Sequence, residues 1–295
     1  MKSPLVTVGI PFFNTEKWLL DAVRSVFAQS FDDWELILMD DGSTDGSVQI
    51  AQTIDDPRIR VYSDGQNLRL AERCNQMVRL ARGKYVARFD ADDMMHPERL
   101  QRQVAFLESN GSVDVLGTGA FILDRRGGVI GKRLPPPSCA PSLSPRRIPF
   151  LHPTVMGRLT WFRQNPYDAR LRGAQDMELW LRTGSYSRFA NLAEPLYFYA
   201  EFESFSRKKY HSYWRDTWEV IRRHGPRLVG RVNTHKEILK GYLKVAIYTG
   251  AYYCGLHEHL LRRRSLSVLP EEKIAAEAIL ERIRQQELPL KSEAP

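Results

Sequence analysis

The spacing of hydrophobic residues in the first half of the chain alternates between the periods typical of strands and of helices. Short apolar runs predict strands. These are Val6–Ile10, Trp34–Met39, Arg58–Tyr62, Tyr85–Phe89 and Val113–Leu116. Between them, helical stripes begin after Asn14, near Asp45, near Leu70 and at Pro97. Asn14 is expected to cap the first of these helices. Strands that alternate with crossover helices favour a parallel sheet with helices on its faces.

The pattern is less regular in the second half. Gly127–Pro149 holds two proline-rich runs and is expected to form a long loop, of the kind that is functional or disordered in compact domains. A helix is expected to begin near Asp176, and Ala190–Tyr199 has the pattern of a strand. The remainder of the chain is helical almost to its end. We therefore expect an α/β domain over residues 1–204 and a helical region over residues 205–295.

The composition is that of an ordinary soluble globular protein. The chain has 295 residues, of which 43% are hydrophobic and 26% are charged. Cys74, Cys139 and Cys254 are widely separated, so neither a disulfide framework nor a zinc site is expected. The N-terminal apolar run is too short for a secretory signal, and Ile238–Leu256 holds too many lysines and glycines to span a membrane. These features favour a reducing cytoplasm.

Positive charge is concentrated in the last third of the chain. The net charge is +8, and residues 201–295 hold 18 Lys and Arg against 12 Asp and Glu, which leaves +2 for the first 200 residues. Basic residues alternate there with aromatic ones: Lys208, Lys209, Arg222, Arg223, Arg262, Arg263 and Arg264 with Trp214, Trp218, Tyr242, Tyr248, Tyr252 and Tyr253. This pattern suits peripheral binding to an anionic membrane, and it equally suits a solvated basic face over a buried aromatic stripe. Nucleic-acid binding is not expected, because no module for it is recognisable.

Acidic residues follow two of the expected strands. Asp40 and Asp41 come directly after the second strand, and Asp90, Asp92 and Asp93 follow the fourth. Ligands bind at the carboxyl ends of strands in open parallel sheets. Three carboxylates within four residues repel one another unless a cation neutralises them, and Mg²⁺ or Mn²⁺ prefers such oxygen ligands. Each run taken alone also fits a plain solvated turn.

A third acidic position, Asp176, lies at the start of a helix in the run QDMELWLR over 175–182. Taken alone it fits a helix cap or a first-turn carboxylate. Four motifs precede it in fixed order: VGIPFFN at 8–14, DDGS at 40–43, RCN at 73–75 and ARFDADD at 87–93. Together the five motifs resemble glycosyltransferase family 2 over about residues 4–200. The resemblance implies the GT-A nucleotide-binding fold, a mostly parallel central sheet flanked by helices, here with a helical C-terminal extension.

The resemblance also implies how the donor is bound. Pro11, Phe13 and Asp41 would hold the nucleotide base, with the Asp41 carboxylate accepting a hydrogen bond from a ring N–H. Asp40 lies beside Asp41 and would share its role. Arg73 would face the diphosphate or the donor sugar, because its planar fork suits phosphate oxygens. The family's habit favours a UDP-sugar as the donor.

The chemistry would lie with the later motifs. Asp90 would contact the ribose or the donor sugar, and Asp92 would ligate a divalent metal, Mn²⁺ or Mg²⁺, that stabilises the leaving diphosphate. Asp93 is adjacent and is a secondary candidate. Asp176 would be the general base that takes the proton of the acceptor hydroxyl, in a single displacement that inverts the anomeric carbon. His152, in the element HPT, is a second secondary candidate, and a structural role fits it better.

Two departures refine this expectation. Position 175 is Gln175 where relatives often have an acidic residue, so a paired carboxylate at the base is not expected. A QxxRW motif, which polymer-forming relatives carry, is missing from the sequence, which favours transfer of a single sugar to a saccharide or lipid-linked acceptor in cell-surface polysaccharide or glycolipid assembly. Two alternatives stay open. A non-catalytic assembly subunit would keep the fold, and a nucleotidyltransferase would need a Gly-rich phosphate loop that PFFN at 11–14 does not provide.

Overall fold

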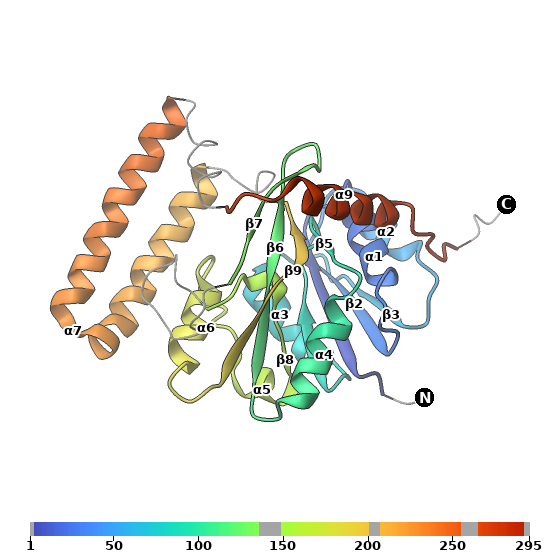
Figure 1. Ribbon diagram of the computed structural model, residues 1–295. Helices are drawn as coiled ribbons and strands as arrows, with labels where there is room; N and C mark the ends of the chain where they lie inside the picture. The colour runs from blue at the N-terminus through green and yellow to red at the C-terminus, as the bar shows by residue number, and fades with distance from the viewer. Residues whose placement is uncertain (1–2, 136–148, 201–206, 255–264, 292–295) are drawn as a thin grey trace.

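A computed structural model describes residues 3–135, 149–200, 207–254 and 265–291. Its centre is a nine-stranded sheet with the order β3-β2-β1-β4-β8-β6-β9-β5, and β7 pairs with β6 (Figure 1). The strands are β1 Val6–Phe12, β2 Trp34–Asp40, β3 Ile59–Tyr62, β4 Tyr85–Arg88, β5 Met94–Met95, β6 Val115–Leu123, β7 Val129–Arg133, β8 Met156–Arg158 and β9 Phe189–Tyr199. The helices are α1 Leu19–Phe27, α2 Ser47–Gln52, α3 Arg69–Leu80, α4 Arg99–Ser109, α5 Leu159–Gln164, α6 Gln175–Thr183, α7 Arg207–Tyr253 and α9 Pro270–Arg284, with a 3₁₀ turn η2 at His152–Thr154.

The predicted α/β fold is confirmed. Strands β3, β2, β1 and β4 are parallel neighbours, as the alternating pattern of the first half predicts. The other half of the sheet is mixed, because the short strand β8 runs antiparallel between β4 and β6, whereas β6 and β9 are parallel. The carboxyl ends of β1, β2 and β4 therefore meet at one edge of the sheet, where the acidic motifs follow β2 and β4.

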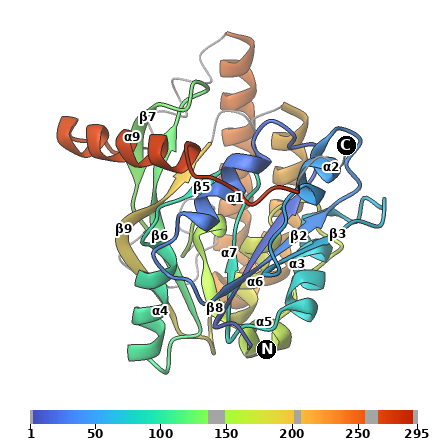
Figure 2. The ribbon, with the colours of Figure 1, turned by 90° about the vertical axis from the view of Figure 1, so that its right-hand side faces the viewer.

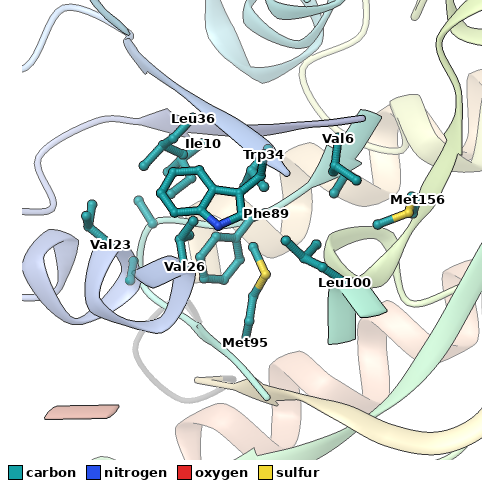
Figure 3. Close-up of a cluster of buried hydrophobic side chains, with 14 of the residues drawn as sticks. Val6, Ile10, Val23, Val26, Trp34, Leu36, Phe89, Met95, Leu100 and Met156 are labelled. Atoms are coloured by element: carbon teal, nitrogen blue, oxygen red, sulfur yellow. The ribbon is translucent and has the colours of Figure 1, made fainter. Parts of the chain in front are cut away.

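Helices cover both faces of the sheet. Helices α1, α2 and α4 contribute to one apolar cluster, which Figure 3 shows around Trp34, Val23, Val26 and Phe89. Helices α3, α5 and α6 contribute to the cluster on the opposite face. Every residue of β1 and β2 is buried, which explains why these strands read as continuous apolar runs instead of alternating ones.

Two local predictions are wrong. Asn14 does not cap α1, which begins at Leu19 without a side-chain cap. The Asn14 backbone is left-handed (φ 52°), and its side-chain oxygen instead accepts the backbone N–H of Thr44 at 2.8 Å, so it joins the loop after β1 to the loop after β2. The expected loop Gly127–Pro149 contains strand β7, which pairs with β6. Residues 136–148 of that loop lie outside the described part of the chain.

The predicted helical C-terminal extension is confirmed in α7. A non-helical residue, Gly230 (φ 79°, ψ 162°), divides this helix into two arms that fold back on each other, at the left of Figure 1. We call residues 207–229 the inner arm and residues 231–253 the outer arm. They contact through Trp218 and Tyr242, whose rings stack with centroids 4.0 Å apart. The aromatic packing stripe, one of two interpretations of the sequence, therefore accounts for part of this region.

The end of the chain returns to the sheet. Helix α9 buries Ala276, Leu280 and Ile283 in a cluster with residues of β5, β6, β7 and β9, and lies across that end of the sheet in Figure 2. Beyond it, Leu290 forms an antiparallel bridge with Ile54, next to α2. Arg262, Arg263 and Arg264, and the side chains of Lys208 and Lys209, lie outside the part that is described. No helix of the described residues is both long and apolar enough to cross a bilayer.

Candidate active site

The turn after β2 is held by its own carboxylates. Asp40 is 1% exposed, and its two oxygens accept the backbone N–H of Ser43 at 2.9 Å and the hydroxyl of Ser63 at 2.7 Å. Gly42 has φ +77°, and an added Cβ would lie 2.9 Å from the backbone carbon of Gln66, so only glycine fits. The DDGS motif therefore fixes the backbone that presents Asp41.

Asp41 fixes the start of α3. Its carboxylate accepts the backbone N–H groups of Leu68 at 2.7 Å and Arg69 at 2.9 Å, and Nε of Arg73 at 3.1 Å. Arg69 has a left-handed backbone (φ 72°), a conformation that a non-glycine residue keeps only where neighbouring contacts stabilise it. Its side chain is exposed, so the hydrogen bond to Asp41 is the contact that does so. The structure thus joins two of the predicted donor residues, Asp41 and Arg73, directly.

The guanidinium of Arg73 is fully engaged within the protein. Arg73 is 1% exposed and pairs with Asp64 at 2.6 Å in addition to Asp41, while Gln76 and the Gln66 carbonyl accept further hydrogen bonds. The hydrogen bonds that Arg73 and the backbone N–H of Gln66 donate to Asp64 lower the pKa of that carboxyl to about 2. In this structure Arg73 therefore binds two carboxylates of the protein, and its expected contact with the diphosphate or the donor sugar stays a prediction.

The remaining donor candidates lie at the end of β1. Pro11 is buried and pairs in register with Met39 of β2, whereas Phe13 is 46% exposed at the same edge. An exposed aromatic face at this edge can stack on a planar base. A cavity of about 330 Å³ adjoins the site beside α3 and is lined in part by Ser63 and Arg73. Pro11 and Phe13 do not line it, so it flanks the predicted base site without coinciding with it.

The acidic run after β4 gathers three carboxylates. Oxygen atoms of Asp90, Asp92 and Asp93 lie within 4.8 Å of one another. Asp93 is buried, and its oxygens accept the Tyr197 hydroxyl at 2.8 Å and the Ala200 N–H at 2.7 Å. Burial and the negative charges of Asp92 and Asp90 raise the pKa of the Asp93 carboxyl well above its usual range. These oxygens are the donor set that a hard divalent cation takes.

A buried arginine, which the sequence analysis did not single out, lies beneath this cluster. Arg88, the last residue of β4, is 5% exposed and pairs with Asp90 at 2.5 Å. Its Nε and Nη1 atoms are buried without a hydrogen-bond partner among the described residues. A charged residue inside the buried run YVARF was the available signal, because a buried cation needs an anionic partner.

Asp176 lies near the same arginine. It is the second residue of α6, it is half-buried, and no side chain caps this helix. Burial raises the pKa of the Asp176 carboxyl, and the charge of Asp90 acts in the same direction. A backbone hydrogen bond from Met177 and the charge of Arg88 oppose the rise. Asp176 and the acidic cluster are therefore within electrostatic reach of each other. A half-buried carboxylate with a raised pKa near an acidic cluster has the properties of a general base.

His152 has a structural position. It is buried in η2, and its Nε2 atom lies 2.9 Å from the Tyr167 hydroxyl. Burial, together with the charge of Arg88, lowers the pKa of His152 well below its usual value, so its imidazole is neutral. The ring also contacts Trp180 of α6, with ring centroids 6.3 Å apart. His152 therefore supports the packing behind Asp176.

Comparison with known proteins identifies the family. A family model described as glycosyl transferase family 2 matches residues 7–171. The chain belongs to this family. It is 34% identical over 255 residues to the putative glycosyltransferase EpsE of Bacillus subtilis (strain 168), an alignment that covers 83% of this chain and 91% of EpsE.

Solved structures of glycosyltransferases share the fold. TarS of S. aureus in complex with UDP superposes with a TM-score of 0.55 at 20% identity, covering 80% of this chain and 70% of that one. The mannosyltransferase PcManGT of Pyrobaculum calidifontis, in complex with GDP-Man and Mn²⁺, superposes with a TM-score of 0.57 at 14% identity, covering 97% and 87%. The protein is therefore a glycosyltransferase enzyme of family 2 with the GT-A fold, as the five motifs predict.

Proposed function

We propose that the enzyme transfers a single sugar from a nucleoside-diphosphate donor, with a UDP-sugar favoured, to an acceptor hydroxyl. The observation that carries the proposal is the cluster of Asp90, Asp92 and Asp93 at the end of β4, with Asp176 within electrostatic range of Asp90 and Arg88, because a donor site and a base must adjoin one reacting carbon. Phe13 and Asp41 would bind the base, and Asp90 the ribose or donor sugar. Support for UDP comes from TarS, whose structure holds UDP.

A divalent cation fits the acidic cluster. Asp92 would hold it, with Asp90 and Asp93 as neighbouring carboxylates. Bound there, Mn²⁺ or Mg²⁺ supplies Lewis-acid stabilisation of the leaving diphosphate. The presence of Mn²⁺ with a nucleotide sugar in PcManGT supports this part of the proposal.

Asp176 would accept the proton of the acceptor hydroxyl. A single displacement with one base inverts the anomeric carbon, and we propose that stereochemistry. Gln175 stands beside Asp176, so the base acts without an adjacent carboxylate. We propose residues 1–204 as the catalytic part and residues 205–295 as its accessory region.

The outer arm of α7 supports a lipid-linked acceptor at an anionic membrane. Leu239, Leu243 and Ile247 lie at helical spacing on it and are 70%, 61% and 52% exposed. Lys236 and Lys240 are exposed on the same arm. An exposed apolar stripe flanked by lysines is the composition of helices that lie in the membrane interface. We propose that the enzyme is cytoplasmic, binds the membrane peripherally through this arm, and acts in polysaccharide or glycolipid assembly.

A donor panel tests the proposed function. Purified enzyme with Mn²⁺ is offered UDP-, GDP- and dTDP-sugars, and the melting temperature and the rate of donor hydrolysis are measured with and without EDTA. We expect a UDP-sugar to stabilise the protein most and to be hydrolysed only with the metal present. Hydrolysis that continues in excess EDTA, or a donor preference for GDP or dTDP, would contradict the corresponding part of the proposal.

A further inference from the structure

One buried carboxylate of the inner arm holds the backbone just ahead of α6. Asp216 is 4% exposed, and its Oδ2 atom accepts the N–H groups of Arg172 at 2.7 Å and Gly173 at 2.8 Å. Its Oδ1 atom accepts Nε of Arg215 at 3.2 Å. Both backbone donors would lose a charged acceptor if Asp216 moved, and a hydrogen bond to a charged group is stronger than one between neutral groups. Asp216 therefore fixes residues 172–173 against the inner arm.

The next residues lead directly to the proposed base. Ala174 has a left-handed backbone (φ 54°, ψ 18°), a conformation that a non-glycine residue keeps only where its surroundings impose it. Gly173 touches the inner arm so closely that an added Cβ would lie 3.1 Å from Cα of Tyr213. Asp176 follows two residues after Ala174. The backbone that aims Asp176 is thus determined by contacts with α7.

Further contacts join the inner arm to both sides of this segment. Arg223 pairs with Asp168 at 2.8 Å, ahead of the segment. His224 lies 3.3 Å from Glu178, which follows Asp176 on α6. Apolar residues of the inner arm and α6 also share one buried cluster. The segment from Asp168 to Glu178 is therefore braced by α7 along its length.

We propose that Asp216 is a positioning residue for the reaction: it sets the location of Asp176, so turnover depends on α7 while donor binding does not. This inference rests on the proposed role of Asp176 as the base. The donor residues lie on β1, β2, α3 and the turn after β4, away from the bond that Asp216 makes. A displacement of about 1 Å in a catalytic group can lower a rate by roughly 10²-fold.

The test replaces Asp216 and separates turnover from binding. Asp216→Ala removes the acceptor, and we expect kcat to fall by roughly 10- to 100-fold. Asp216→Asn keeps one oxygen that can accept both N–H groups, so it should recover part of that loss. For both variants the KM of the UDP-sugar and the Kd of UDP with Mn²⁺ should stay within about twofold of the native values. A merely structural defect would not give this split or this order of variants.

Two control variants test whether the location of the substitution or a general loss of stability could explain a lower kcat. Arg215→Gln removes the partner of the other carboxylate oxygen of Asp216 and leaves both backbone bonds in place, so its kcat should be native. Ile283→Val removes one methylene group from the buried cluster between α9 and the sheet, to which α6 does not contribute. It should lower the melting temperature without lowering kcat. All rates are measured well below the lowest melting temperature of the set.

Hydrogen exchange supplies a readout that does not need activity. Peptides over residues 168–180 should exchange faster in Asp216→Ala than in the native protein, while peptides of α3 should not change. A native kcat in Asp216→Ala, or an equal loss of kcat and UDP affinity, would overturn the inference. If the native enzyme transfers no sugar, the proposed function fails instead, and unchanged exchange over residues 168–180 would then overturn the positioning role independently.

Discussion

At the scale of single residues, Asp92 is the most direct test of the metal site. Asp92→Asn turns a charged ligand into a neutral one, so transfer should be abolished and metal-dependent UDP binding should weaken sharply. The measurement is a Mn²⁺ titration of activity and of UDP binding. Asp32→Asn, an exposed acid ahead of β2, is the control and should behave as the native enzyme does. Full activity of Asp92→Asn in Mn²⁺ would remove Asp92 from the metal site.

Asp176→Asn separates a base from a structural carboxylate. Donor binding should persist while turnover falls by roughly 10²–10⁴-fold. Only the ionised form of Asp176 accepts a proton, and burial raises the pKa of this carboxyl above its usual value. As the pH is lowered, the native rate should therefore begin to fall at a higher pH than it would with an ordinary carboxyl as the base. The variant should lack that acid limb.

The effect of Asp176→Asn on the melting temperature also distinguishes a general base from a helix cap. A carboxyl whose folded pKa is raised binds its proton more tightly when folded, so its stabilising contribution is present at low pH and is lost as pH rises through the folded pKa. At neutral pH Asp176→Asn should therefore leave the melting temperature unchanged or raise it. A helix cap would instead lose about 1 kcal/mol of stability and keep its turnover. A near-normal rate with a lower melting temperature would end the assignment.

The sequence revealed the types of site residue better than their partners. Three carboxylates in four residues are visible in any reading of positions 90–93, and the structure does bring them together. The pairing of Arg73 with Asp41 and Asp64 is not visible, because it joins residues up to 32 positions apart. Arg88 was missed for a different reason: its partner Asp90 is only two positions away, and the charge inside the buried run YVARF was not used as a signal. The sequence pattern indicates that a charged residue is buried, whereas only the folded structure shows which oppositely charged residue pairs with it.

At the scale of elements, Gly241 tests how the two arms of α7 are joined. Replacing a glycine inside a helix by alanine ordinarily stabilises it by about 0.5–1 kcal/mol. At Gly241 an added Cβ would lie 2.6 Å from Nε1 of Trp218 and 2.8 Å from Cζ3 of Trp214, so Gly241→Ala should lower the melting temperature. Gly250→Ala, on the same arm with nothing within 4 Å of the added atom, should raise it. Equal shifts in both variants would show that the arms do not pack in this way.

Long, strongly periodic elements were predictable and short ones were not. The four parallel strands and their helices follow from apolar runs and stripes that each extend over several residues. Strand β8 has three residues, Met156–Arg158, too few to show any period, yet it joins the two halves of the sheet. Strand β7 was hidden within a stretch rich in proline and glycine. The break at Gly230 was not predicted, because a single glycine is tolerated inside many helices.

At the scale of the whole molecule, the two arms of α7 have different surroundings. The inner arm packs against α6, which carries Asp176. The outer arm lies farther from the sheet (Figure 1) and has exposed apolar residues, among them Leu239 and Leu243. In the proposed function, the first contact would link residues 205–295 to catalysis, and the exposed residues of the outer arm would provide a surface for a membrane. A lipid-linked acceptor would then be met by the same element that holds the proposed base. This arrangement predicts that binding to anionic vesicles depends on the outer arm.

The test is sedimentation with vesicles of phosphatidylcholine that contain about a third of phosphatidylglycerol. Each basic residue near an anionic surface contributes on the order of 1 kcal/mol, and the apolar stripe adds to it, so the native protein should sediment with these vesicles. Binding should weaken in 1 M salt, where the Debye length falls to about 3 Å. Replacing both Leu239 and Leu243 by serine should abolish it. Ile274→Ser, at a residue of α9 that is 69% exposed, should not affect it.

Each alternative has its own outcome. Equal sedimentation of the native protein and the double variant would show that the outer arm does not bind the membrane. A native dimer that the double variant loses, without any vesicle binding, would show that the stripe of Leu239, Leu243 and Ile247 covers a second copy of the chain. Binding that persists in 1 M salt and is lost in the double variant would place the interaction in the apolar stripe alone, and Lys236 and Lys240 would then carry no part of it.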